Sequence, residues 1–297
     1  MTKLKYKFTY DTLFKLLFVK YPDLLKRLVA VILGIKVKQI SEFRITNPEI
    51  PPEAIGNKFC KLDINMVVNG QLANLEVQVE DEGDYPERTL YHWARVFSSA
   101  LKAGNPYSSL PRVIIISIVD FMMFDCAEYR SEFLPLEVSR RELLSDRMAM
   151  IYFEVRKLPK DIGIDNELEL MLSLFRAKTE EDLKQLEELE VTIVKQAIGA
   201  YREIVASPEF RELERLRADA RHNEASALLN AERKAEKAER EKWQGVVADK
   251  DAALADMDAA LADKDAALAD KDAALADKDA EIERLRAQLK KQDDSMN

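Results

Sequence analysis

Two acidic residues, Asp63 and Glu76, lie in two short runs in which polar and apolar residues alternate. These runs could bring the two carboxylates together. The runs cover residues 61–68 and 71–78, and an Asn-Gly pair at 69–70 joins them. Asn-Gly between alternating segments predicts a β-hairpin with a two-residue turn, because both residues accept the positive φ of a type I′ turn. Such a turn fixes the register of the two strands, so Asp63 is predicted to lie directly opposite Glu76.

Two carboxylates that face each other across a hairpin repel, at roughly 4.5–5.5 Å between Cβ atoms, so the pair predicts a cation between them. A hard ion such as Mg²⁺ takes one or two carboxylates and fills its other positions with water and substrate phosphate. It would activate water for hydrolysis. The alternative is the solvated face of a half-exposed hairpin, with Lys61 softening the repulsion. The spacing alone leaves both interpretations open.

Strand side chains alternate in direction, so the hairpin has two different faces. The polar face is predicted to be a site and comprises Lys61, Asp63, Asn65, Val67, Leu72, Asn74, Glu76 and Gln78. The apolar face is predicted to be core and comprises Leu62, Ile64, Met66, Val68, Ala73, Leu75 and Val77.

The flanking sequence predicts the elements that position the hairpin. Apolar residues at helical spacing over 8–33, interrupted by Pro22 and ended by Gly34, indicate two helices. A loop rich in proline and glycine at 47–57 leads into the hairpin. After it we expect a helix over 86–103, a buried strand over 113–119 and a last core strand over 152–155.

Asp, a hairpin and then Glu-x-Gln resemble the PD-(D/E)XK nuclease signature, in the variant used by the Rpn family of recombination-promoting nucleases and putative transposases. Three further stretches are similar to that family in the same order. They are YDTLFKLLF at 10–18, DYPERTLYHW at 84–93, and GNPY at 104–107 before the apolar run 113–119. The resemblance covers roughly residues 5 to 240.

The resemblance implies an α/β fold with a restriction-endonuclease-like core of helix, β-meander, helix and strand. It also implies that Asp63 and Glu76 bind Mg²⁺ and that Gln78 orients water. Gln78 stands where much of the wider superfamily has Lys, and a glutamine offers hydrogen bonds without charge. Lys61 or Lys15 could supply that charge, although each is expected to be a solvated lysine.

Other side chains have weaker predicted roles. Asp11, in the first helix, is predicted as an outer metal ligand. Arg88, Tyr91 and Arg95 fall on one face of the helix after the hairpin and are predicted to contact DNA phosphates. The alternative is that Tyr91 is core and the arginines extend past it into solvent.

Composition narrows the class of protein. Two cysteines and two histidines among 297 residues provide neither a disulfide framework nor a zinc spacing. His92 is expected to be a packed or surface histidine. The basic start of the chain lacks an apolar signal region, and the run 113–119 is too short for a bilayer. We expect a cytoplasmic protein with no membrane contact and no nucleotide cofactor.

The chain is predicted to have three parts: a nuclease-like core over 1–165, a helical extension over 166–245, and a repeat tail over 246–297. Residues 249–280 hold ten Asp and four Lys, a net −6 of the chain's −9, which leaves the rest near neutral. Leucine recurs every seven residues in the tail. A coiled coil needs two apolar positions in each heptad to face the partner helix, and here the second of them is held by Asp or Lys. This pattern predicts a solvated helical arm, at most a weak coiled coil for a homo-oligomer.

The interpretation that follows is a Mg²⁺-dependent DNA endonuclease, with a link to recombination or mobile elements that comes from the resemblance only. The alternative is a binding module. In it, the Lys-to-Gln change has weakened or abolished cleavage, and the chain holds DNA or a protein partner and oligomerises through its tail.

Overall fold

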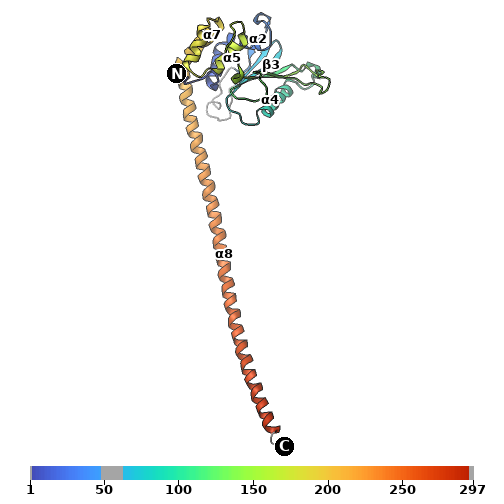
Figure 1. The fold of residues 1–297 in the computed structure, drawn as a ribbon, viewed down its shortest axis with the longest axis vertical. Coiled ribbons are helices and arrows are strands. Elements are labelled where there is room, and N and C mark those ends of the chain that lie inside the picture. The colour runs from blue at the N-terminus through green and yellow to red at the C-terminus, as the bar shows by residue number, and fades with distance from the viewer. Residues whose placement is uncertain (1, 48–62, 294–297) are drawn as a thin grey trace. The chain divides into compact units, whose positions relative to one another are not determined.

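The computed structural model describes residues 2–47 and 63–293, which form two compact units, Met1–Glu224 and Ala225–Asn297. The first unit contains a six-stranded sheet with strand order β1-β2-β3-β4-β6-β5. Its strands are β1 Phe43–Ile45, β2 Ile64–Val68, β3 Gln71–Gln78, β4 Val113–Val119, β5 Arg130–Phe133 and β6 Met148–Glu154. The described helices are α1 Asp11–Lys20, α2 Pro22–Ile32, α4 Tyr85–Ser99, α5 Glu167–Arg176, α6 Glu180–Glu188, α7 Thr192–Ala206 and α8 Pro208–Asp293 (Figure 1).

The predicted hairpin is confirmed. β2 and β3 pair antiparallel, and both turn residues have positive φ, 49° and 76°. The outermost described pair is Ile64 with Leu75, so the next position out sets Asp63 opposite Glu76. The side chain of Asn69 holds the turn in place, because its Oδ1 accepts from the backbone N–H groups of Ser41 and Glu42.

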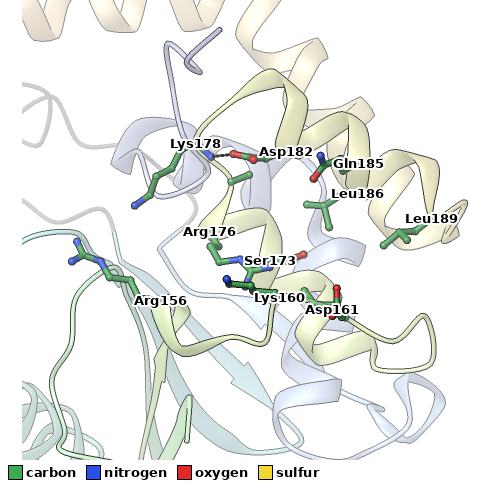
Figure 2. Close-up of a pocket in the computed structure, with 12 residues that line it drawn as sticks. Arg156, Lys160, Asp161, Ser173, Arg176, Lys178, Asp182, Gln185, Leu186 and Leu189 are labelled. Carbon is green, nitrogen blue, oxygen red and sulfur yellow. Dashed lines mark hydrogen bonds between the residues drawn. The ribbon is translucent and has the colours of Figure 1, made fainter. Parts of the chain in front are cut away.

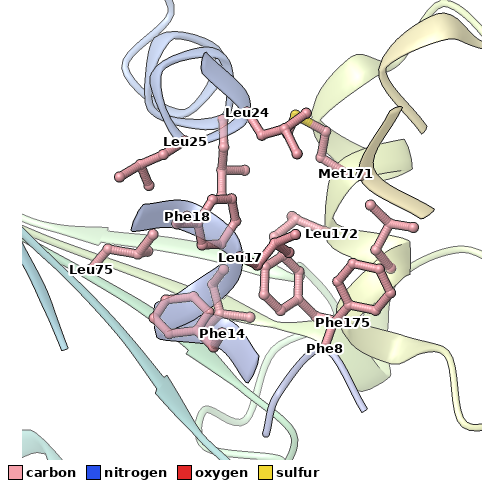
Figure 3. Close-up of a cluster of buried hydrophobic side chains, with 14 of the residues drawn as sticks. Phe8, Phe14, Leu17, Phe18, Leu24, Leu25, Leu75, Met171, Leu172 and Phe175 are labelled. Atoms are coloured by element: carbon pink, nitrogen blue, oxygen red, sulfur yellow. The ribbon is translucent and has the colours of Figure 1, made fainter. Parts of the chain in front are cut away.

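The sheet is covered on both faces. One face carries the main core, to which α1, α2, α5 and α7 contribute, and the predicted apolar face of the hairpin faces into it. Figure 3 shows Phe14 and Phe18 of α1 beside Phe175 of α5, with ring centroids 6.2 and 6.4 Å from Phe175. A smaller apolar cluster on the other face includes Trp93 and Phe97 of α4. The β3 part of the hairpin's polar face, with the buried Asn74, Glu76 and Gln78, therefore lies on the side of the sheet that α4 covers.

The connections fit the predicted order of elements. β1, β2 and β3 form the antiparallel meander, α4 follows, and β4 then pairs parallel to β3. β6 pairs parallel to β4, so the carboxyl ends of these three strands lie at one edge of the sheet.

Several boundaries differ from the predictions. The helix expected over 86–103 is α4, which ends at Ser99, and the strand expected over 152–155 is the longer β6. The resemblance implies a meander, but the residues of its first strand, β1, were not predicted, and β5 was not predicted at all. Most of the predicted loop at 47–57 lies outside the described residues.

The helical region predicted from residue 166 packs into the main core. Leu172 of α5 and Ile198 of α7 are fully buried there. A capping box begins α6, since Thr179 and Asp182 bond reciprocally. The predicted divisions at 165/166 and 245/246 stay predictions.

The heptad repeats lie in α8. Their leucines are exposed, with relative accessibilities of 58% at Leu254, Leu268 and Leu275. Self-association of this stripe stays a prediction. Among the described residues, no helix is both long and apolar enough to cross a membrane.

Candidate active site

The carboxylates of Asp63 and Glu76 face each other at the edge of the sheet. Burial raises the pKa of the Asp63 carboxyl, and the negative charge of Glu76 raises it further. Glu76 is only 4% exposed, and Asn74 and Gln78 on the same face are similarly buried. The alternative of a solvated polar face is therefore wrong for these β3 residues.

Helix α4 encloses Glu76. Tyr85, in its first turn, is buried and donates from its hydroxyl to Glu76 Oε2 at 3.3 Å. Two turns later, His92 Nδ1 lies 3.4 Å from Glu76 Oε1, and its side chain is 42% exposed. His92 was expected only as a packed or surface histidine. The spacing of seven residues from Tyr85, which sets both on one helix face, is the sequence signal that could have placed it.

Lys15 of α1 lies at the same site. It is 1% exposed, and its Nζ donates to the backbone carbonyls of Asn47 and Asp63, the latter at 2.9 Å. Burial lowers the pKa of the Lys15 ammonium, and the charge of Asp63 raises it. The expectation of a solvated lysine is wrong for Lys15, because its side chain is buried and its ammonium group is bonded to two backbone carbonyls.

Two asparagines, Asn74 and Asn47, bond to Asp63, and a third, Asn65, bonds to both of them. Asn74 Nδ2 donates to Asp63 Oδ2 at 2.5 Å and to Asn65 Oδ1 at 2.9 Å. Asn47 Nδ2 donates to the Asp63 carbonyl at 3.1 Å, and Asn47 Oδ1 accepts from the backbone of Asn65 at 2.7 Å. Sequence reasoning placed Asn74 and Asn65 on the polar face but assigned them no role.

The predicted water-orienting residue, Gln78, lies two residues beyond Glu76 on the same strand face. Its Nε2 donates to the carbonyl of Glu80 at 2.7 Å, which fixes the amide plane. Lys61, predicted opposite Gln78, lies outside the described residues.

Asp11 is one helical turn before Lys15, and its carboxylate accepts from Arg217 of α8 at 3.0 Å. Its described partner is thus a cation, whereas the titratable side chains that act on Asp63 are Glu76, Lys15 and His92. The outer-ligand role predicted for Asp11 stays untested.

The three predicted phosphate contacts on α4 differ in their surroundings. Arg88 stacks over the ring of Tyr85 at 4.7 Å and bonds to Glu82, while its Nε and Nη2 are buried without a hydrogen-bond partner in the described part of the chain. Tyr91 is 60% exposed, and Arg95 lies 5.8 Å from its ring. The alternative of a core tyrosine is therefore wrong.

The donor set fits a hard divalent ion. Over residues 2–47 and 63–293, no three His, Cys, Asp or Glu side chains are grouped to hold a metal on their own. Mg²⁺ needs only one or two carboxylates, because it keeps several water ligands. Two facing carboxylates, one with a pKa raised by burial and by the charge of the other, are such a pair.

A family model described as PD-(D/E)XK nuclease family transposase matches residues 8–231. The chain belongs to this family. The match confirms the resemblance and spans the hairpin, α4 and the helices up to the first turns of α8. Membership indicates a nuclease or transposase-related role. Neither the curated proteins nor the solved structures contain a match to the chain.

Replacing Asp63 with Asn is expected to raise the melting temperature of the metal-free protein at pH 7 by about 1–4 °C, the effect of relieving one facing like-charge pair. Folding raises the pKa of Asp63, so the folded chain holds this proton more tightly than the unfolded chain does. Stability is therefore lost as the pH rises through the raised pKa.

Below the ordinary aspartate pKa of about 3.9, Asp63 is protonated in both the folded and the unfolded chain. The difference in melting temperature between the wild type and Asp63→Asn should therefore vanish. Calorimetry in EDTA at pH 3.5 and pH 7 measures this. Equal melting temperatures of the wild type and Asp63→Asn at pH 7 would show that Glu76 imposes no net repulsion on Asp63.

Proposed function

We propose that this chain is a metal-dependent endonuclease that hydrolyses phosphodiester bonds in DNA. The observation that carries the proposal is the pair formed by the half-buried Asp63 and the buried Glu76, facing each other beside the buried Lys15. Families with this signature are nucleases, and this chain keeps both acidic positions. The link to recombination or mobile elements rests on the family description alone.

Asp63 and Glu76 would hold Mg²⁺, which supplies positive charge to a bound water and to the phosphate oxygens. Asn74 donates a hydrogen bond to Oδ2 of Asp63, and Tyr85 and His92 contact the two carboxylate oxygens of Glu76. Both carboxylates are therefore orientated before a metal ion binds. Pre-orientated groups stabilise a transition state without reorganising.

The remaining steps fall to three side chains. Gln78 hydrogen-bonds the attacking water, and Lys15 adds a fixed positive charge beside Asp63. Arg88 steadies the phosphate with guanidinium nitrogens that have no other hydrogen-bond partner in the described ranges. An arginine fork suits phosphate oxygens, and α4 directs it toward the side of the sheet that carries Glu76.

Purified full-length protein tests the proposal on supercoiled plasmid. Conversion to nicked and linear DNA is expected with Mg²⁺ and is expected to stop with EDTA. A folded protein that leaves the plasmid intact across Mg²⁺ and Mn²⁺ concentrations would overturn the proposal.

The second candidate function is a nuclease fold that binds DNA without cutting it. It is favoured by Gln78, whose amide is bonded to the Glu80 carbonyl and carries no charge. Under this function the plasmid assay gives no product, while the same protein retards DNA fragments in a gel.

Truncation after Gln244 is expected to leave metal-dependent cleavage near the full-length level. The repeats have one apolar seam position per heptad, and Asp and Lys are not four residues apart, so the tail gains little from zipper packing or helical ion pairs. Its acidic charge should repel DNA, so the truncated protein should bind DNA slightly more tightly.

Light scattering and plasmid cleavage measure the effect of this truncation, with a change in oligomer size as the largest expected consequence. A truncated protein that folds but no longer cuts would show that the tail belongs to the functional assembly.

A further inference from the structure

A cavity of about 660 Å³ opens beside the 3-10 turn η3 Val155–Lys157, between that turn and helices α5 and α6. Figure 2 shows cationic side chains on one side of it and leucines on the other. The lining residues used below are Arg156, Lys160, Arg176, Lys178, Leu186 and Leu189. None of them has a role in the site under α4.

The lining is cationic on balance. Four basic side chains face two acidic ones, Asp161 and Asp182. Asp182 is already engaged, since its Oδ2 accepts from the backbone N–H groups of Lys178 and Thr179 at 2.8 and 2.9 Å, and these bonds lower its pKa against the effect of burial. Together, these four basic and two acidic side chains leave the lining with a net charge of +2.

Asp120 organises the basic side chains. It follows β4, is buried, and accepts from Arg156 Nε at 2.9 Å, with Lys178 Nζ at 3.7 Å and Lys7 Nζ at 3.9 Å. One carboxylate cannot neutralise three cations. Arg156 and Lys178 keep side-chain exposures of 48% and 50%, so both can bind a further anion from solution.

The cavity shares a sheet edge with the carboxylate pair. The backbone N–H of Asp120 donates to the carbonyl of Gln78 at 2.9 Å, and Arg156 follows the end of β6. Glu76 is covered by α4 on one face, while the cavity adjoins α5 on the other. A strand of nucleic acid that crosses this edge would therefore reach both.

We propose that the cavity binds one phosphorylated nucleotide unit of the nucleic acid strand that the carboxylate pair acts on. The phosphate lies between Arg156 and Lys178, and the base lies against Leu186 and Leu189. Pockets of roughly 300–1,000 Å³ hold small organic ligands, which suits a single nucleotide better than an extended backbone. This inference rests on the proposed function for its substrate.

DNA binding by the full chain in EDTA tests the proposal without cleavage. Fluorescence anisotropy with a labelled single-stranded oligonucleotide compares Lys178→Gln with Lys184→Gln, which makes the same charge change on α6 outside the cavity lining. Lys178→Gln should weaken binding by about threefold to tenfold and lower the salt slope by about 1. Lys184→Gln should leave both near the wild-type values.

A second variant, Gln185→Trp, fills the cavity without changing charge, because Gln185 lines it and is exposed. It should also weaken binding. Deoxyadenosine 5′-monophosphate should compete with the oligonucleotide on the wild type, and deoxyadenosine without phosphate should not. A mononucleotide that binds as tightly as the oligonucleotide would instead make the occupant a free nucleotide and overturn the strand assignment.

Equal binding by Lys178→Gln and Lys184→Gln, or unchanged binding by a folded Gln185→Trp, would overturn the proposal. These outcomes are separate from the proposed function. If the wild type cuts plasmid but Lys178→Gln and Lys184→Gln bind DNA equally, only the proposal for the cavity is refuted. If DNA binding depends on the cavity but the wild type never cuts, only the proposed nuclease activity is refuted.

Discussion

Asp63→Ala and Glu76→Ala are each expected to lower Mg²⁺-dependent plasmid nicking by at least about 100-fold. Removal of even a residue that supports a metal ligand costs roughly 10- to 100-fold in metal affinity or activity, and these two residues are the proposed ligands themselves. The measurement is the initial rate of nicked product formation at saturating Mg²⁺.

The matched control is Glu128→Ala, which removes an exposed carboxylate outside the site. It should cut like the wild type. Mg²⁺ should raise the melting temperature of the wild type and of the control, because a ligand that binds only the folded state stabilises it. It should not do so for either site variant. Full cleavage by a folded Asp63→Ala or Glu76→Ala protein would show that the metal is held elsewhere.

The hairpin could be predicted because its information is local. Asn69 and Gly70 specify one turn type, and a two-residue turn leaves one register, so the opposition of Asp63 and Glu76 follows from counting. The buried strand β4 was equally predictable, since a seven-residue run that is apolar except for Ser117 forms a strand with both faces covered.

The unpredicted strands depend on partners that are distant in sequence. β1 has three residues and β5 has four, and neither shows a sustained alternation of its own. β1 exists because β2 offers it an edge, and β5 because β6 does. Sequence periodicity carries no signal for a strand this short.

The surroundings of the carboxylates were unpredictable for a related reason. The polar face of the hairpin read equally well as solvated, and only the packing of α4 over β3 and β4 buries Glu76 and brings His92 to it. Residue type also misled, because lysines are rarely buried without partners. Lys15 is buried because two backbone carbonyls, one of Asn47 after β1 and one of Asp63 at the start of the hairpin, accept its hydrogen bonds.

Lys15→Met is expected to reduce cleavage by about 100-fold, the scale seen when one orientated donor at a reacting centre is removed. Lys15 is the buried cation found in contact with Asp63 in the described chain, and Gln78 cannot replace its charge. Methionine keeps most of the side-chain volume and removes only the ammonium group.

The same substitution leaves the carbonyls of Asn47 and Asp63 without the lysine donor, at a cost of about 1–3 kcal/mol in unfolding free energy. Cleavage must therefore be measured well below the melting temperature of the variant, and the metal-induced rise in melting temperature must be measured beside it. Retained metal stabilisation with lost cleavage would assign Lys15 to the chemical step.

Adding Gln78→Lys to the Lys15→Met variant separates charge from structure. Lysine at position 78 restores a positive charge where the wider superfamily has one, so part of the lost cleavage should return, and Gln78→Lys alone should keep or increase activity. A purely structural role for Lys15 predicts no such rescue, because a positive charge at position 78 does not replace the hydrogen bonds that Lys15 donates to the carbonyls of Asn47 and Asp63. Undiminished cleavage by Lys15→Met, or a folded double variant no better than the single one, would remove Lys15 from the catalytic set.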